Sequence, residues 1–101
     1  MTVFEKKVLE LTSLIPKGKV TTYKLLAQAI GRPNASRAIA NALGKNRSLI
    51  VVPCHRVIRS DGQAGGYQKG RAKKIEILST EGVKIKAGKI LDFKKILHKY
   101  D

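Results

Sequence analysis

The sequence predicts a single, mostly α-helical domain with short extended segments. A chain of 101 residues has room for one hydrophobic core. Apolar residues recur every three or four positions in several stretches, and glycine or proline follows most of them. Runs rich in β-branched residues are short. No repeat or linker divides the chain, so we expect one domain over residues 1–101.

The first helix is predicted over residues 3–15. Thr2 and Glu5 have the spacing of a capping box, and apolar residues follow at helical intervals. Pro16 and Gly18 are expected to end this helix.

A helix-turn-helix is predicted over about residues 21–44. Thr21 or Thr22 caps its first helix, and Gly31 ends that helix where a left-handed residue is favoured. Asn34 is the expected cap of the second helix. Two short helices joined by a glycine-containing turn are typical of this motif, although an ordinary helical hairpin has the same pattern.

The outward face of the second of these helices suits a DNA groove. It carries small or polar residues and one cation, which are Ser36, Arg37, Ala40 and Asn41. Small side chains let the helix axis approach a groove, and Arg37 can bind a phosphate or enter the base stack.

The segment at residues 49–58 holds the only cysteine of the chain. Residues 49–52 have the β-branched character of a buried strand, and Pro53 ends that strand just before Cys54. His55 follows, and a neighbouring base can convert a thiol into the thiolate that attacks as a nucleophile. A small, unreactive core residue is the alternative interpretation of Cys54.

Residues 62–70 form a predicted covering loop with four glycines and Tyr67. Such a loop can bring its backbone close to a ligand, and Tyr67 can lie flat against a ring. A flexible surface loop is equally consistent with this composition. The loop lacks the Gly-Lys-Ser/Thr ending of a phosphate-binding P-loop.

A fourth helix is predicted over residues 71–80, with Gly82 ending it. Glu81 then lies at the C-terminal end of this helix, where the helix dipole disfavours a carboxylate. We therefore expect Glu81 either to have a specific partner or to be solvated. Residues 84–101 form a strongly basic tail, which is expected to contain a short strand and a last helix capped by Asp92.

The formal net charge of +14 makes a polyanion, and nucleic acid in particular, the first partner to consider. One cysteine excludes an internal disulfide, and with two histidines we expect no metal site and no cofactor. No apolar run reaches the length of a membrane span, and the first residues lack a signal-peptide pattern. We expect a monomer without membrane contacts in the cytoplasm, or in the nucleus of a eukaryote.

Together, a cysteine nucleophile, a helix-turn-helix and a glycine-rich aromatic loop indicate chemistry on a base taken out of the DNA duplex. The most specific residues are Pro53-Cys54-His55-Arg56-Val57, preceded by the helix-turn-helix and followed by Gly65-Gly66-Tyr67. In these features the chain resembles the C-terminal domain of the O6-alkylguanine-DNA alkyltransferases, also called methylated-DNA-protein cysteine methyltransferases. The resemblance covers about residues 4–82 and implies the winged-helix-like fold of that domain.

The resemblance implies irreversible transfer of the alkyl group from O6 of a flipped guanine in double-stranded DNA to Cys54. It implies that His55 acts as the base through a water and that Glu81 orients His55. Tyr67 would cover the guanine and assist the leaving oxygen. Because the thioether formed is stable, each molecule would act once, in DNA repair, with no cofactor.

Further roles also follow from the resemblance. Arg37 matches the finger that enters the base stack, and Tyr23 the tyrosine that helps rotate the nucleotide. Asn46 matches the asparagine that ties the helix-turn-helix to the active site. The backbone carbonyls of Cys54 and Val57 would read the guanine amino group, and the helix-turn-helix would dock in the minor groove.

One departure from the family concerns the covering loop. The family commonly has a small residue and then two glycines after the tyrosine, whereas Gln68 and Lys69 precede Gly70 here. The resemblance therefore leaves open the width of the substrate pocket and its tolerance of bulky alkyl groups.

Three other functions compete with alkyl transfer. An alkyltransferase-like protein recognises alkylated guanine without repairing it and recruits other repair proteins; such proteins resemble this chain with the cysteine replaced, usually by tryptophan, so Cys54 favours transfer. A helix-turn-helix transcription regulator needs a dimer face, and the chain shows no heptad or exposed apolar stripe. A cysteine hydrolase needs an oxyanion hole, for which the sequence offers no candidate.

Overall fold

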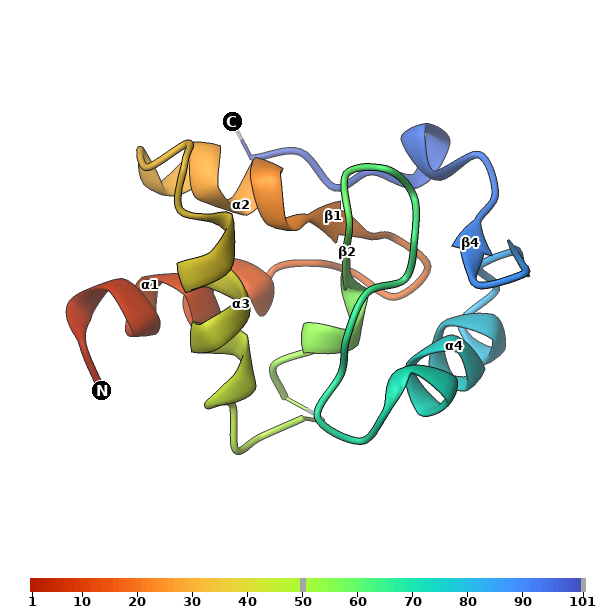
Figure 1. The fold of residues 1–101 in the computed structure, drawn as a ribbon, viewed down its shortest axis with the longest axis horizontal. Helices are drawn as coiled ribbons and strands as arrows, with labels where there is room; N and C mark the ends of the chain where they lie inside the picture. Colours follow the sequence, from red (N-terminus) through yellow and green to blue (C-terminus); the bar gives the residue numbers. More distant parts are fainter. Residues whose placement is uncertain (50, 101) are drawn as a thin grey trace.

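Helices dominate the computed structural model, which describes residues 1–49 and 51–100 (Figure 1). The α-helices are α1 (Val3–Thr12), α2 (Tyr23–Ile30), α3 (Ser36–Gly44) and α4 (Arg71–Thr80). The strands are β1 (Thr21–Thr22), β2 (Val57–Ile58), β3 (Ile85–Lys86) and β4 (Lys89–Ile90), and the short 3-10 helices are η1 (Cys54–Arg56) and η2 (Phe93–Ile96). Within the described residues, no helix combines the length and the apolar character needed to cross a bilayer. The predicted fold class, mostly α with short extended segments, is confirmed.

Helix α1 begins where the sequence predicts but ends earlier. Glu5 N–H donates to Thr2 Oγ1 over 3.0 Å, and Thr2 N–H donates to Glu5 Oε1 over 2.9 Å, which completes the capping box. The helix ends at Thr12 rather than at residue 15, because Pro16 disfavours the α conformation of the residue before it. Tighter turns continue from there, and Ile15 is still buried in the core.

Helices α2 and α3 form the helix-turn-helix. The Thr22 hydroxyl caps α2 by accepting a backbone N–H over 3.0 Å, and Gly31 ends α2 with a φ of 85°. Both of these predictions are confirmed. The prediction of Asn34 as the cap of α3 is wrong by one position, because the carbonyl of Ala35 accepts the first hydrogen bond of this helix, from Ile39 N–H.

Residues 49–52 do not form the predicted buried strand. Leu49 and Val51 lie in turns, and Val51 is 74% exposed. Ile50 belongs to the same prediction but lies outside the described residues.

Local hydrogen bonds explain this difference. Ser48 N–H donates to Asn46 Oδ1 over 2.9 Å, and Val52 N–H donates to Ser48 O over 2.8 Å, so the chain turns here instead of extending. Side chains such as that of asparagine offer the backbone an alternative to strand pairing. The β-branched residues of this segment indicated a strand because the competing turn depends on contacts from Asn46.

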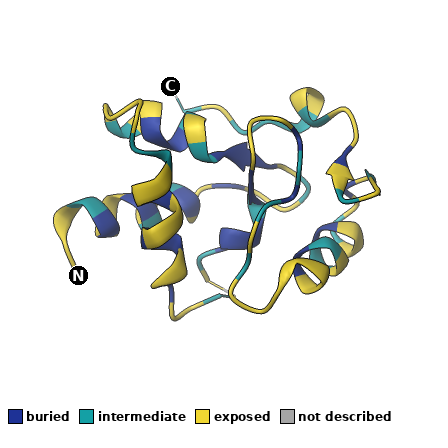
Figure 2. Ribbon diagram, in the orientation of Figure 1, coloured by how far each residue is buried: buried dark blue, intermediate teal, exposed yellow. Residues whose placement is uncertain are grey.

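Strands β1 and β2 connect the helix-turn-helix to the rest of the fold. They pair in parallel, Thr21 with Val57 and Thr22 with Ile58. One group of buried side chains lies among α1, α2, α3 and η1, and a second lies around β2, α4 and β4 (Figure 2). Because β1 leads directly into α2 and β2 follows directly after η1, this pairing fixes the cysteine segment against the helix-turn-helix.

The chain beyond α4 folds back across the molecule towards α2 (Figure 1). Strands β3 and β4 form the predicted extended part as an antiparallel hairpin. The predicted last helix is only the 3-10 turn η2, and Asp92 does not cap it, because its φ of 51° is left-handed whereas a capping residue is extended. His98 N–H then donates to Val20 O over 2.7 Å, and the Tyr100 hydroxyl donates to Leu11 O over 2.8 Å. Part of the basic tail is thus packed on the fold.

Candidate active site

Cys54 is the first residue of η1 and lies in the wall of a cavity. A 3-10 turn continued by the paired strand β2, rather than a strand at residues 49–52, carries the thiol. Cys54 is only 6% exposed. The cavity has a volume of about 330 Å³ and is lined by Tyr23, Ala40, Leu43, Gly44, Cys54, Gly66, Tyr67 and Gln68. Helices α2 and α3, η1 and the covering loop therefore meet at the thiol.

The surroundings of Cys54 keep it protonated. Burial raises the pKa of the Cys54 thiol, and this effect outweighs the Asn46 side chain and the Lys74 cation, which act in the opposite direction. An ordinary cysteine already titrates at about 8.5. Nucleophilic chemistry at Cys54 therefore needs a base nearby.

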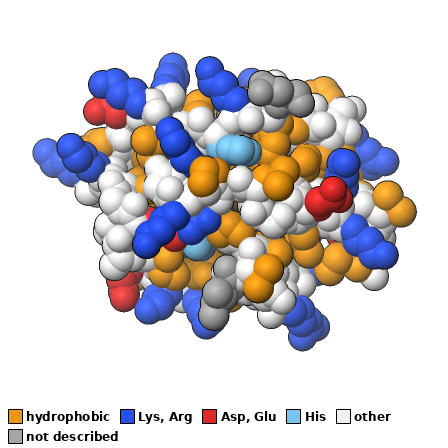
Figure 3. Space-filling model, turned by 180° about the vertical axis from the view of Figure 1, so that it is seen from behind, with side chains coloured by type: hydrophobic (Ala, Val, Ile, Leu, Met, Phe, Trp, Pro, Cys, Tyr) orange, Lys and Arg blue, Asp and Glu red, His pale blue; other side chains and the backbone are white. Residues whose placement is uncertain are grey.

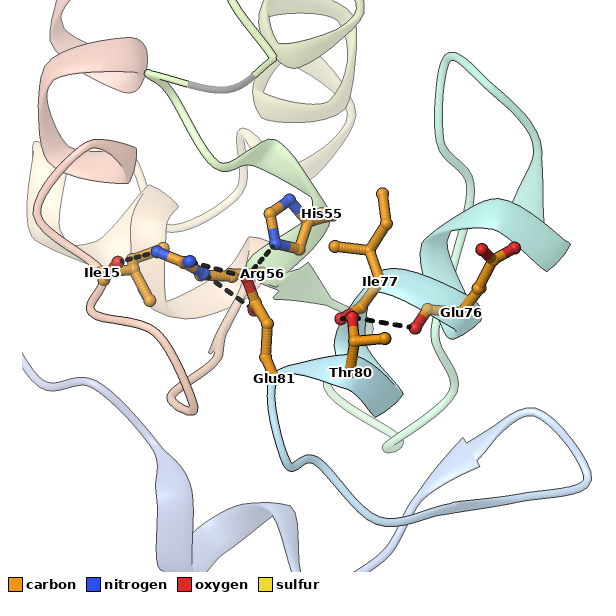
Figure 4. Close-up of polar contacts among 7 residues, drawn as sticks. All are labelled: Ile15, His55, Arg56, Glu76, Ile77, Thr80 and Glu81. Atoms are coloured by element: carbon orange, nitrogen blue, oxygen red, sulfur yellow. Dashed lines mark hydrogen bonds and ion pairs between the residues drawn. The ribbon is translucent and has the colours of Figure 1, made fainter.

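His55, Arg56 and Glu81 form one polar network beside Cys54 (Figure 4). His55 Nε2 lies 3.0 Å from Glu81 Oε2. Arg56 donates from Nε to Glu81 Oε1 over 3.0 Å and from Nη2 to Glu81 Oε2 over 2.7 Å. Its Nη1 also donates to Ile15 O over 2.8 Å. Of the two alternatives predicted for Glu81, a specific partner or a solvated carboxylate, the first is confirmed.

The network determines the protonation of His55. For Glu81, burial raises the pKa, but hydrogen bonds from Arg56 and His55 outweigh it and hold the pKa below its ordinary value. An ionised carboxylate only accepts, so His55 Nε2 carries the proton and Nδ1 keeps a lone pair. Burial lowers the pKa of His55 despite the opposing effect of Glu81, so the imidazole is neutral at pH 7. Nδ1 is buried and has no hydrogen-bond partner among the described residues, which makes it available to accept a proton.

The end of α4 fixes the position of Glu81. Glu81 is the C-cap, and Gly82 follows with a φ of 92°. Val83 N–H donates to Leu78 O and Gly82 N–H donates to Ser79 O, both over 3.1 Å, which is the Schellman arrangement. The predicted place of Glu81 at the C-terminal end of this helix is confirmed. Its two basic partners offset the unfavourable helix dipole.

Tyr23 and Tyr67 form aromatic walls of the cavity. The Tyr67 ring meets His55 edge to face, with centroids 6.3 Å apart and an interplanar angle of 78°. Gly65 has a φ of 80°, and a Cβ atom at this position would lie 3.2 Å from Tyr23 Oη, so glycine allows the covering loop to approach α2. Burial raises the pKa of both tyrosines, which therefore keep their hydroxyl protons at neutral pH.

Asn46 connects the end of α3 to the cysteine segment. It is buried, and its Nδ2 donates to Val52 O over 2.9 Å, two residues before Cys54. Gln68 of the covering loop donates from Nε2 to Leu43 O over 3.0 Å and to Asn46 O over 2.8 Å. The end of α3, the cysteine segment and the covering loop are thus joined on one side of the cavity.

Lys74 is the site residue that sequence reasoning missed. It is 0% exposed, and its Nζ donates to Val57 O over 2.6 Å and to Gly66 O over 3.0 Å. Burial lowers the pKa of Lys74 to about 8, with Cys54 acting in the opposite direction. The only sequence signal was its spacing of four residues from the buried Leu78, and lysine is almost never fully buried.

The position of Lys74 bears on two other parts of the site. It joins β2 to the covering loop, and its Nζ lies 5.7 Å from the centroid of the Tyr23 ring, within the range of a cation–π contact. It also takes one lone pair of the Val57 carbonyl, the group that the family resemblance assigns to the guanine amino group. A carbonyl oxygen has two lone pairs, so one remains for such a contact.

The outward face of α3 borders the cavity. Arg37, Ala40 and Asn41 are exposed and Ser36 is half-buried. Ala40 also lines the cavity, one turn after Arg37. Lys and Arg side chains are not confined to this side of the molecule, since Figure 3 shows them distributed over the opposite face. Among residues 1–49 and 51–100, no three His, Cys, Asp or Glu side chains are grouped so that they could hold a metal ion.

Comparisons with known proteins agree on one family. The model of the 6-O-methylguanine DNA methyltransferase DNA-binding domain matches residues 3–83. The methylated-DNA–protein-cysteine methyltransferase of Methanothermobacter thermautotrophicus is 47% identical over 85 residues, which are 83% of this chain and 47% of the relative. The bifunctional transcriptional activator/DNA repair enzyme Ada of Escherichia coli is 42% identical over 80 residues, 79% of this chain and 23% of Ada. The chain thus spans less than half the length of these curated relatives.

Solved structures are similar over the whole fold. Atl1 of S. pombe, in complex with damaged DNA containing O6-carboxymethylguanine, is 31% identical with a TM-score of 0.86, over 99% of this chain and 98% of Atl1. OGT of Mycobacterium tuberculosis, in complex with DNA, is 40% identical with a TM-score of 0.77, over 80% of this chain and 50% of OGT.

Proposed function

The chain belongs to the family of 6-O-methylguanine DNA methyltransferase DNA-binding domains, and on this premise we propose that it repairs DNA by transferring the alkyl group of an O6-alkylguanine to Cys54. One observation carries the proposal: a cavity next to the outward face of α3 contains a thiol, and a neutral histidine oriented by a carboxylate follows that thiol in the chain. A flipped base is the substrate that such a cavity beside a DNA-binding helix would receive.

His55 is the base in this mechanism. Neighbouring side chains in a chain segment tend to diverge, so the Cys54 proton passes to Nδ1 of His55 through a water rather than directly. Glu81 accepts from Nε2–H and stabilises the imidazolium that forms. Arg56 holds the carboxylate in place with two hydrogen bonds.

The thiolate then attacks the alkyl carbon. A bond forms between sulfur and this carbon as the bond between the carbon and O6 breaks, and the electron pair of the broken bond stays on the guanine oxygen. Tyr67, which lines the cavity and keeps its hydroxyl proton, assists the leaving oxygen. Guanine takes up one proton, which balances the proton lost by the thiol. Because the thioether is stable, each protein molecule acts once.

The helix-turn-helix supplies the contact with double-stranded DNA. The face of Ser36, Arg37, Ala40 and Asn41 lies against the groove, and Arg37 enters the base stack in place of the flipped nucleotide. Tyr23 stands in the wall of the cavity, where it contacts the nucleotide that rotates in. The two neighbours solved with DNA support DNA as the partner.

A sensor of alkylated guanine that does not repair it is the second candidate function. The similarity to Atl1 over nearly the whole of both chains favours this alternative. Cys54 and its polar neighbours favour transfer, because a sensor has no use for a nucleophile with an oriented base.

Mass spectrometry separates the two functions. The protein is incubated with a duplex that contains O6-methylguanine, and transfer predicts one added methyl group on the Cys54 peptide. Cys54→Ala should bind the duplex and remain unmodified. An unmodified wild-type peptide at saturating DNA would reject transfer and support the sensor.

A further inference from the structure

Gln68 separates two cavities. The cavity of Cys54, about 330 Å³, and a larger open cavity of about 840 Å³ share Gly44 and Gln68 in their linings. The larger cavity lies beside the end of α3 and is otherwise lined by Met1, Glu5, Lys45, Asn46, Arg47 and Leu49. Gly44 has no side chain, so Gln68 supplies the only side chain common to both linings as described.

Two hydrogen bonds hold Gln68 in this position. Its Nε2 group donates to Leu43 O over 3.0 Å and to Asn46 O over 2.8 Å. Carbonyls at the end of a helix lack partners within the helix, and both acceptors lie at the end of α3. The side chain therefore spans from the covering loop to α3, and both amide protons are used.

We infer that Gln68 is a specificity-determining residue that restricts the pocket to small alkyl groups such as methyl. This inference rests on the proposed function. A bulky aryl-methyl group on O6 does not fit beside guanine in the inner cavity unless it extends into the outer one, and Gln68 closes that path. Displacing Gln68 costs its two hydrogen bonds, which corresponds to roughly tenfold to thirtyfold in rate.

Lys69 provides a matched control. It lies in the same loop and is also a departure from the family, but it is exposed and is not among the described residues lining either cavity. Removing the Gln68 side chain joins the two cavities, whereas removing the Lys69 side chain leaves both unchanged. The two departures therefore have different expected effects on substrate size.

The test compares single-turnover transfer from duplexes carrying O6-methylguanine or O6-benzylguanine. Gln68→Ala should raise the benzyl-to-methyl rate ratio by roughly tenfold to thirtyfold. Gln68→Glu, which keeps the length but loses both donors, should raise it too, and Lys69→Ala should leave it at the wild-type value. A ratio that is the same in all four proteins would overturn the inference. A general loss of stability lowers both rates and does not produce the expected change in their ratio.

A second measurement does not depend on DNA or on alkyl transfer. Methyl and benzyl methanethiosulfonate each form a mixed disulfide with the Cys54 thiolate and release methanesulfinate, so the two labelling rates report access to the thiol. The benzyl-to-methyl labelling ratio should rise in Gln68→Ala and not in Lys69→Ala. If the wild type is labelled but takes no methyl group from DNA, the proposed function fails while this ratio still supports or overturns the role of Gln68.

Discussion

Glu81→Gln should separate the structural and chemical roles of the network beside Cys54. The carboxylate accepts from His55 and twice from Arg56, with the three side chains 8%, 15% and 10% exposed for His55, Arg56 and Glu81. Glutamine has a single acceptor oxygen, so at least one donor loses its partner and the Arg56 charge is left uncompensated. Removing one partner of a buried ion pair costs about 3–5 kcal/mol, and since this pair is partly exposed we expect a loss of about 3 kcal/mol.

The rate of transfer should fall as well. In the transition state His55 becomes an imidazolium, and the hydrogen bond from a charged donor to Glu81 contributes about 1.5–3 kcal/mol. Its loss corresponds to a reduction of roughly tenfold to hundredfold in the single-turnover rate on O6-methylguanine DNA. Urea denaturation measures the first effect, and the methylated fraction of Cys54 against time measures the second.

Glu76→Gln is the control for this variant. Glu76 also lies on α4, but it is exposed and pairs only with Lys73 over 3.3 Å among the described residues, so its removal should cost no more than about 0.5 kcal/mol. If Glu81→Gln matches Glu76→Gln in both stability and rate, then the network has neither role, and the reasoning is wrong.

The same substitution makes an acid-stability prediction. Because the pKa of Glu81 is depressed in the folded protein, its contribution to stability is complete above the unfolded value of about 4.3 and is lost as the pH falls towards the folded pKa. Wild type and Glu81→Gln should therefore converge in stability at low pH. Curves that stay parallel would contradict the depressed pKa.

Three other predictions concern DNA and Lys74. Arg37→Ala should slow repair of O6-methylguanine in duplex DNA more than reaction with the free O6-methylguanine base, and equal losses would refute its place in the base stack. DNA affinity should fall with salt, with a log-log slope of about 0.9 per phosphate neutralised; a titration that shows no slope would rule out phosphate contacts. Burial holds the pKa of Lys74 at about 8, below its unfolded value of about 10.4, so the folded state binds fewer protons between these values and the free energy of unfolding should gain about 3 kcal/mol from this residue as the pH rises through them. Lys74→Met should lack this gain, and the difference between wild type and variant in urea denaturation at about pH 7 and about pH 10 measures it.

The sequence predicted those features that depend on neighbouring residues. The capping box of Thr2 and Glu5, the Thr22 cap and the left-handed Gly31 were all located correctly, because each is a contact within four residues or an intrinsic property of glycine. The place of Glu81 at the end of α4 was found for the same reason. The resemblance around Cys54 then indicated the family, which the comparisons confirm.

Features that depend on distant contacts were missed or wrong. Residues 49–52 turn rather than extend because Asn46 binds the backbone there, and η2 replaces the predicted last helix. Lys74 is buried because two carbonyls, from β2 and from the covering loop, accept its protons, and a pattern of apolar spacing cannot predict a buried cation.

The sequence by itself therefore determined the helices, the family and the identity of the nucleophile. Only the tertiary structure decided how the thiol is mounted, which nitrogen of His55 is free, and where Gln68 lies between two cavities. The physical reason is distance along the chain: His55 and Glu81 are 26 residues apart, and Gln68 and Leu43 are 25 apart. Caps and turns follow from local hydrogen bonds, whereas these contacts exist only after the two cores have packed.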